Sequence, residues 1–129
     1  MDHLFMDLWE KPSRLVVGLM SGTSADGIDA VLTRITGSGL STRVEQLGFH
    51  FLPFDRATRQ AILNICGGEH GGTREICLLG THLGMLYAQA VRELLKATGT
   101  KKVDLIGSHG QTVHIIGIGG IFDLIQIFD

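Results

Sequence analysis

The sequence predicts an α/β domain built on a mixed sheet, with elements in the order strand, strand, strand, helix, helix, strand. Three short stretches rich in β-branched residues lie in the first half of the chain, separated by polar turns. Apolar residues then recur at helical spacing, and a last apolar stretch follows at 103–107. The 129 residues are 44% hydrophobic and 19% charged, which suits one folded domain.

The first three strands are expected to form an antiparallel meander, because short turns join them. Residues 14–20 (RLVVGLM) read as a buried strand, and residues 28–35 and 43–51 alternate between apolar and polar positions. The second strand would place Ile28, Ala30 and Leu32 on one face, and Asp29 and Thr33 on the other. The third would place Leu47, Phe49 and Phe51 opposite Gln46, Gly48 and His50.

Two helices are predicted to follow the meander. Asp55 is a good N-cap for the first, which would end at Gly67 and Gly68. The second would begin at Gly72 or Thr73 and stop at Gly99. Its apolar positions recur at helical spacing and predict a buried stripe: Ile76, Leu79, Leu83, Leu86, Tyr87, Ala90, Val91 and Leu94.

Beyond the helices, residues 103–107 (VDLIG) predict a fourth, buried strand. Because it returns through helices, it is expected to run parallel to the first strand. Residues 108–114 (SHGQTVH) are interpreted as a polar loop at its carboxyl end, and residues 121–128 as a candidate fifth strand. Residues 1–13 are interpreted as an N-terminal extension to the domain of residues 14–129.

Charge and composition argue against several classes of protein. The net charge is -2, and the 11 Lys and Arg residues form no long run, so a nucleic-acid or membrane-surface protein is not expected. The first twelve residues lack the basic and apolar segments of a signal peptide, and no apolar run approaches the roughly 20 residues of a membrane span. The sequence therefore predicts a cytoplasmic protein.

The turn between the first two strands, residues 22–27 (GTSADG), is a candidate phosphate site. Glycines let a ligand approach the backbone closely, and several N–H groups can then face one side. Thr23 and Ser24 add hydroxyl donors, and Asp26 could orient magnesium-bound water. The segment is not a Walker A loop, because the Lys-Ser/Thr pair is missing and a strand follows. An ordinary hairpin turn remains the alternative.

A second polar segment, residues 107–112 (GSHGQT), lies where an α/β sheet usually binds its ligand, just past the carboxyl end of a strand. His and Gln side chains there could hydrogen-bond sugar hydroxyls. An exposed polar loop without a ligand is the alternative. No zinc site is expected and no residue is assigned as a direct metal ligand, because His109 and His114 have no carboxylate or thiol near them in the sequence.

Both segments resemble signatures of one family. Residues 18–29 (GLMSGTSADGID) resemble the opening signature of the anhydro-N-acetylmuramic acid kinases, and residues 107–113 (GSHGQTV) resemble that family's second signature. The two motifs stand in family order with two helices between them, and the resemblance covers about residues 15–113. Levoglucosan kinases share much of the pattern, so levoglucosan is an alternative substrate.

The resemblance implies an incomplete N-terminal lobe of a two-lobed, actin-like (ribonuclease H-like) sugar kinase. It also implies an ATP- and Mg²⁺-dependent reaction that opens 1,6-anhydro-N-acetylmuramic acid and gives N-acetylmuramic acid 6-phosphate during cell-wall recycling. Its partners would be the anhydro-sugar and ATP, with a homodimer left open. ATP-binding residues would be Gly22, Thr23, Ser24, Ala25, Asp26, Gly27, Ile28 and Asp29. Substrate-binding residues would be Ser108, His109 and Gln111.

The chain departs from the family pattern at its C-terminal end. Residues 122–129 (FDLIQIFD) only echo the family's Phe-x-Leu-Gln-Ile-Gly-Asp strand. The Asp-Thr-Gly-Pro-Gly-Asn segment that holds the family's general base does not occur in these 129 residues, so no catalytic residue is assigned and these residues alone are expected to show no kinase turnover. The alternative function is a short, non-catalytic protein that binds nucleotide phosphates or a partner.

Overall fold

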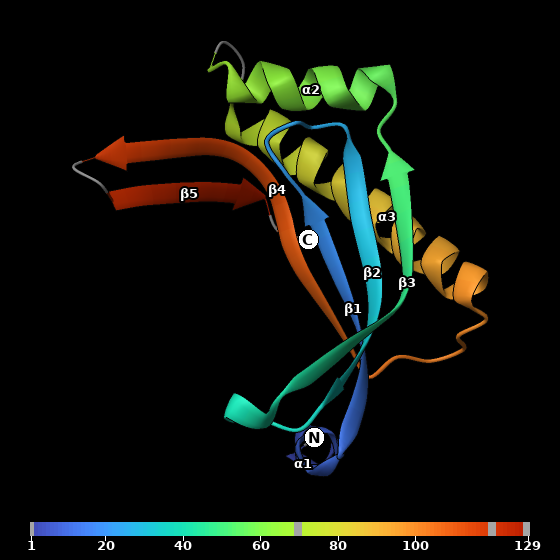
Figure 1. Cartoon of the computed structure of the whole chain (residues 1–129). Helices are drawn as coiled ribbons and strands as arrows, with labels where there is room; N and C mark the ends of the chain where they lie inside the picture. Colours follow the sequence, from blue (N-terminus) through green and yellow to red (C-terminus); the bar gives the residue numbers. More distant parts are fainter. Residues whose placement is uncertain (1, 69–70, 119–120, 128–129) are drawn as a thin grey trace.

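The computed structural model describes residues 2–68, 71–118 and 121–127 of the chain (Figure 1). The predicted order of three strands, two helices and a strand is present, with additional elements before, within and after it. The elements are α1 (Asp2–Glu10), β1 (Ser13–Ser21), β2 (Gly27–Thr36), the 3₁₀ turn η1 (Gly39–Ser41), β3 (Arg43–Pro53), α2 (Arg56–Cys66), α3 (Thr73–Thr98), β4 (Leu105–Ile118) and β5 (Ile121–Ile127). The N-terminal extension contains a helix, α1, before the sheet begins. No helix in the described part of the chain is long and apolar enough to cross a membrane.

The strands form one mixed sheet in the order β3-β2-β1-β4-β5. β1, β2 and β3 pair antiparallel, whereas β4 pairs parallel with β1. Parallel pairing needs a long crossover between the two strands, and α2 and α3 supply most of it. The predicted mixed α/β sheet is therefore confirmed, and β5 adds an antiparallel edge strand to β4.

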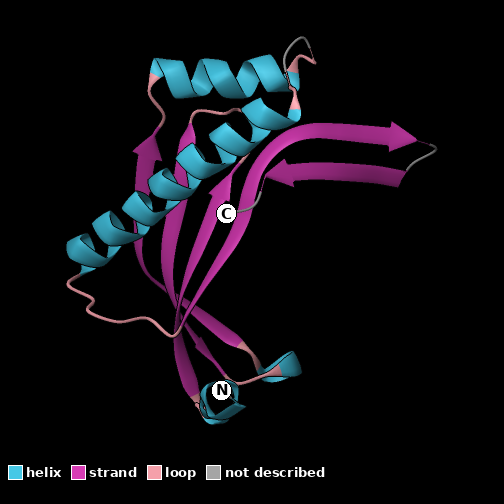
Figure 2. Cartoon of the chain, turned by 180° about the vertical axis from the view of Figure 1, so that it is seen from behind, coloured by secondary structure: helices cyan, strands magenta, loops and turns pink. Residues whose placement is uncertain are grey.

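One face of the sheet is covered by α3 and α2, as Figure 2 shows from behind. The core lies between them, and its largest fully buried helix residues are Tyr87, Ile62, Leu83 and Leu94. Ile28, Ala30 and Leu32 of β2 are buried in this layer, which confirms the face predicted for them. The side chains of Met20, Phe49 and Phe51 remain exposed on the sheet.

The face predicted for Leu47 is wrong, because β3 contains a bulge. Leu32 pairs with Gly48 and Thr33 with Gln46, so Leu47 is an extra residue in β3. A bulge interrupts the two-residue alternation, and Leu47 packs against the core while Phe49 and Phe51 are exposed. No short-range sequence signal marks this extra residue.

The predicted loop at 108–114 is also wrong, because these residues continue β4. Two partners extend the strand past Gly107: β1 pairs with it as far as Gln111, and β5 pairs with residues 111–118. The polar side chains suggested a loop, but pairing with β1 up to Gln111 and with β5 from Gln111 onward supplies backbone hydrogen bonds that do not depend on the side chains. The strand starts at Leu105, two residues later than expected. Leu105 and Ile106 are exposed, so the prediction that this strand is buried is wrong.

Both long helices begin and end where their capping residues predict. Asp55 accepts a hydrogen bond from Thr58 N at 2.7 Å and is the N-cap of α2, which ends at Gly67. α3 runs from the N-cap Gly72 to Gly99, whose φ of 66° is left-handed and suits glycine. These local caps set the first and last residues of α2 and α3.

Candidate functional site

The turn between β1 and β2 has a constrained backbone. A hydrogen bond from Ala25 N to Gly22 O, 3.2 Å long, closes the turn. Ala25 has a φ of 47°, in the left-handed region that costs a residue with a Cβ about 1 kcal/mol, and its methyl group is 1% exposed. The surrounding structure must hold this conformation in place. Strained backbone of this kind is found disproportionately at ligand-binding turns.

Two contacts anchor the end of the turn to β3 and the entry of α2. Phe54 N donates to Asp26 O at 2.9 Å. Gly27 lies so close to β3 that an added Cβ would meet Leu52 O at 2.5 Å. At Gly22, by contrast, an added Cβ would have nothing within 4 Å. The turn is therefore tightly packed at Gly27 and open at Gly22.

Asp26 presents an exposed carboxylate beside the turn. Ser24 Oγ donates to Asp26 Oδ1 at 2.7 Å, and this hydrogen bond is the main reason that the pKa of Asp26 is lowered. The backbone N–H of Asp26 and the positive charge of Arg59 lower the pKa further. Asp26 is therefore ionised at neutral pH, and its oxygens can accept hydrogen bonds from metal-bound water.

Beneath the turn, the buried side chain of Gln111 joins β4 to it. Gln111 Nε2 donates to Gly22 O at 2.8 Å and to Thr112 O at 2.8 Å, and Gln111 Oε1 accepts from Ser21 Oγ at 2.5 Å. Ser21 Oγ also lies 2.8 Å from Gly27 O, and its one proton serves one acceptor at a time. The two sequence motifs are thus in direct contact.

The residues predicted to bind ATP divide into two groups. Gly22, Thr23, Ser24, Ala25 and Asp26 form the turn, whereas Gly27, Ile28 and Asp29 already belong to β2. Ile28 is 0% exposed and its side chain packs in the core, while the side chain of Asp29 is exposed. Contact with ATP stays a prediction for all eight residues.

Of the residues predicted to bind the sugar, Ser108 is exposed, and its Oγ accepts a hydrogen bond from Gly110 N at 3.2 Å. His109 is half-buried. Gln111 is 0% exposed, and both of its amide protons are used within the protein. Their contact with a sugar stays a prediction.

Sequence reasoning included Ser21 in the first motif but assigned it no role. The sequence pattern that could have indicated a role is a small polar residue at the end of a mostly apolar strand. In the structure Ser21 is buried there, at 1% exposed.

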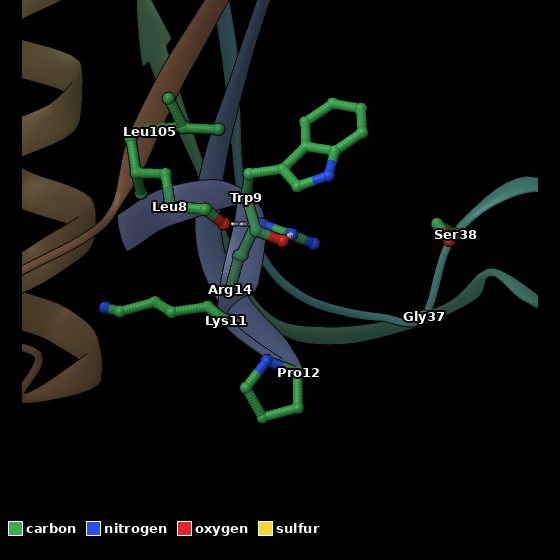
Figure 3. Close-up of a pocket in the computed structure, with 8 residues that line it drawn as sticks. All are labelled: Leu8, Trp9, Lys11, Pro12, Arg14, Gly37, Ser38 and Leu105. Atoms are coloured by element: carbon green, nitrogen blue, oxygen red, sulfur yellow. Dashed lines mark hydrogen bonds between the residues drawn. The ribbon is translucent and has the colours of Figure 1, made fainter. Parts of the chain in front are cut away.

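A cavity of about 600 Å³ lies beside α1, at the other end of the sheet from the turn (Figures 1 and 3). Its charged side chains are already engaged within the protein. Arg14 donates from Nε to Leu8 O at 2.5 Å and from Nη2 to Trp9 O at 2.6 Å, and Lys11 pairs with Asp104. We interpret this cavity as the place where α1 is attached to the sheet.

Comparison with known proteins links the chain to one family. Residues 14–128 match the family model described as "Anhydro-N-acetylmuramic acid kinase". A protein of that name from Caldanaerobacter subterraneus subsp. tengcongensis is 46% identical over 118 residues, which cover 90% of this chain and 30% of the relative. Namesakes from Bacillus thuringiensis subsp. konkukian and Bacillus cereus (strain AH820) are 43% and 42% identical over 101 residues, covering 77% of this chain and 26% of each relative. The chain thus spans less than a third of the length of these curated relatives.

Proposed function

Because the chain belongs to the anhydro-N-acetylmuramic acid kinase family, we propose that it forms the phosphate-binding part of such a kinase. The family is one of sugar kinases of the actin-like ATPase type, and the mixed α/β sheet of this chain supports the proposal that it is part of one lobe of such a kinase. The observation that carries the proposal is the anchored turn between β1 and β2, with the ionised Asp26 beside it.

The turn has the donor groups that a magnesium nucleotide needs. The backbone of Gly22 is accessible, and the hydroxyl group of Thr23 can donate to a phosphate oxygen. The hydroxyl proton of Ser24 is donated to Asp26, so Ser24 would contribute through its backbone N–H and by orienting that carboxylate. Asp26 would hold magnesium through the metal's water ligands, since this ion prefers oxygen donors and retains water. When bound, magnesium neutralises the charge that develops on the transferred phosphate. We propose a cytoplasmic location, where ATP is available.

The proposed reaction breaks one bond of the anhydro bridge and transfers one phosphoryl group. The oxygen of a water molecule bonds to C1, and the bond between C1 and the bridging oxygen breaks. That oxygen remains on C6, bonds to the γ-phosphorus and displaces ADP, so the product is N-acetylmuramic acid 6-phosphate. The proton that leaves the water needs a general base, and the family's base motif does not occur in these 129 residues.

The second candidate function is a non-catalytic protein that binds nucleotide phosphates or a partner. One observation favours it: Met20, Phe49 and Phe51 expose apolar side chains that a partner could cover.

We expect a polypeptide of these 129 residues to give no N-acetylmuramic acid 6-phosphate from 1,6-anhydro-N-acetylmuramic acid and magnesium-ATP. A chimera that joins it to the remaining part of the Caldanaerobacter relative should give this product, because the missing base and lobe are then supplied. Mass spectrometry of the sugar phosphate compares the product of the chain alone with that of the chimera. A parallel assay with levoglucosan tests the alternative substrate. Turnover by the chain alone would refute the expected inactivity. A folded chimera that binds both substrates but transfers no phosphate would refute the kinase proposal.

A further inference from the structure

The buried amide of Gln111 holds one particular peptide group of the turn. Gly22 O accepts two hydrogen bonds, one from Ala25 N within the turn and one from Gln111 Nε2 across the sheet. The second is the shorter, at 2.8 Å against 3.2 Å. Because Nε2 also donates to Thr112 O, both of its protons face carbonyl oxygens, which fixes the orientation of the amide.

The direction of this carbonyl sets the direction of the next N–H. The peptide bonds of the described chain are trans, and in a planar trans peptide the C=O and the N–H point to opposite sides. With Gly22 C=O turned inward to Gln111, the N–H of Thr23 is turned away from the buried amide. Thr23, Ser24 and Asp26 are all exposed.

A bulge in β4 brings Gln111 into this position. Leu19 pairs with Ser108, but Ser21 pairs with Gln111, so β4 has one more residue than β1 between these pairs. Gly110 has a φ of 75°, a left-handed conformation that favours glycine. Without the extra residue, Gly110 would lie opposite Ser21, and no side chain would reach Gly22 O. The His-Gly-Gln order of the second motif thus places the Gln111 side chain against the backbone of the first motif.

We propose that Gln111 is a positioning residue for the phosphate site: by holding Gly22 C=O inward, it presents the Thr23 N–H to a phosphate oxygen before the nucleotide arrives. This inference rests on the proposed function of the turn. It assigns Gln111 a role in phosphate binding that acts through the backbone. A donor that is already oriented loses less entropy on binding, so its hydrogen bond contributes more to affinity.

The test compares the purified chain with Gln111→Met, which keeps the length of the side chain but removes its hydrogen bonds. ¹⁵N relaxation measures the order of the Thr23, Ser24 and Ala25 amides without ligand. Calorimetric titration with magnesium-AMPPNP, a non-hydrolysable ATP analogue, measures affinity. Gln111→Glu is the second variant, since it keeps the acceptor for Ser21 but loses the two donors. Leu94→Ala is the control for a general loss of core packing, because Leu94 is 0% exposed and lies in the last part of α3.

We expect both Gln111 variants to lose order at the three turn amides and to bind AMPPNP about tenfold more weakly, the factor typical of one lost hydrogen bond to a charged group. Leu94→Ala should leave both measurements unchanged while the protein is folded. Turn amides that stay ordered in both Gln111 variants would overturn the inference, as would a mobile turn with unchanged affinity. If the wild type binds no AMPPNP, the proposed phosphate site is contradicted, and relaxation alone decides whether Gln111 orders the turn.

Discussion

Gly27→Ala is expected to lower the free energy of unfolding by about 3 kcal/mol, the upper end of the cost of overpacking a tight site. The added Cβ would lie 2.5 Å from Leu52 O and 2.6 Å from Cζ of the Phe51 ring. Leu52 O belongs to the backbone of β3, so the clash is relieved only if two paired strands move apart. The turn ends at this point and would move with them.

Gly22→Ala is the matched control, because it adds the same methyl group at the other end of the same turn. Nothing lies within 4 Å of a Cβ at Gly22, so its free energy of unfolding should change by less than about 0.5 kcal/mol. Urea unfolding followed by circular dichroism measures both variants. Equal free energies of unfolding for the two variants would show that the close packing at Gly27 does not disfavour an added Cβ.

Asp26→Ala is expected to weaken the binding of magnesium-AMPPNP roughly 10- to 100-fold, the usual cost of removing an outer-shell partner of a metal. The carboxylate is ionised at neutral pH, and Ser24 Oγ and the backbone N–H lower its pKa further by stabilising the charged form. It is exposed, so magnesium-bound water could reach it. Alanine removes the charge and both acceptor oxygens but leaves the backbone contact between Asp26 O and Phe54 N available. The fold should therefore survive.

The measurement is a calorimetric titration with and without magnesium. Glu45→Ala is the control: this exposed carboxylate lies on β3 and pairs with Arg34 at 2.7 Å. Its removal should not change the affinity. The loss at Asp26 should shrink when EDTA removes the metal, because Asp26 is proposed to act through magnesium. Equal affinities of wild type and Asp26→Ala in magnesium would show that this carboxylate is not part of the site.

Local signals were enough to predict the helices and most of the strands. Asp55, Gly72 and Gly99 mark helix ends through backbone geometry and hydrogen bonds within a few residues, and such features can be read directly from sequence. The inward face of β2 followed from its alternation, since Ile28, Ala30 and Leu32 are all buried and Asp29 is exposed. The parallel pairing of β4 with β1 followed from the helices that separate the two strands.

Features that depend on residues far apart in the chain were missed. The bulge at Leu47 exists only relative to β2, and the bulge at Gly110 only relative to β1. Residues 108–114 look like a loop because their side chains are polar, yet their backbone is paired with strands that lie elsewhere in the sequence. The hydrogen bond from Gln111 to Gly22 joins residues 89 positions apart, so no local pattern could reveal it.

The central claim is that the turn between β1 and β2 binds nucleotide phosphates. Titration of the ¹⁵N-labelled chain with magnesium-AMPPNP, followed residue by residue by NMR, tests it most directly. The account predicts that the largest shifts fall on the amides of residues 22–29, with smaller ones at Gln111 and Thr112. Shifts confined to the cavity beside α1, at Trp9 and Arg14, would contradict it, as would a folded chain whose spectrum does not change.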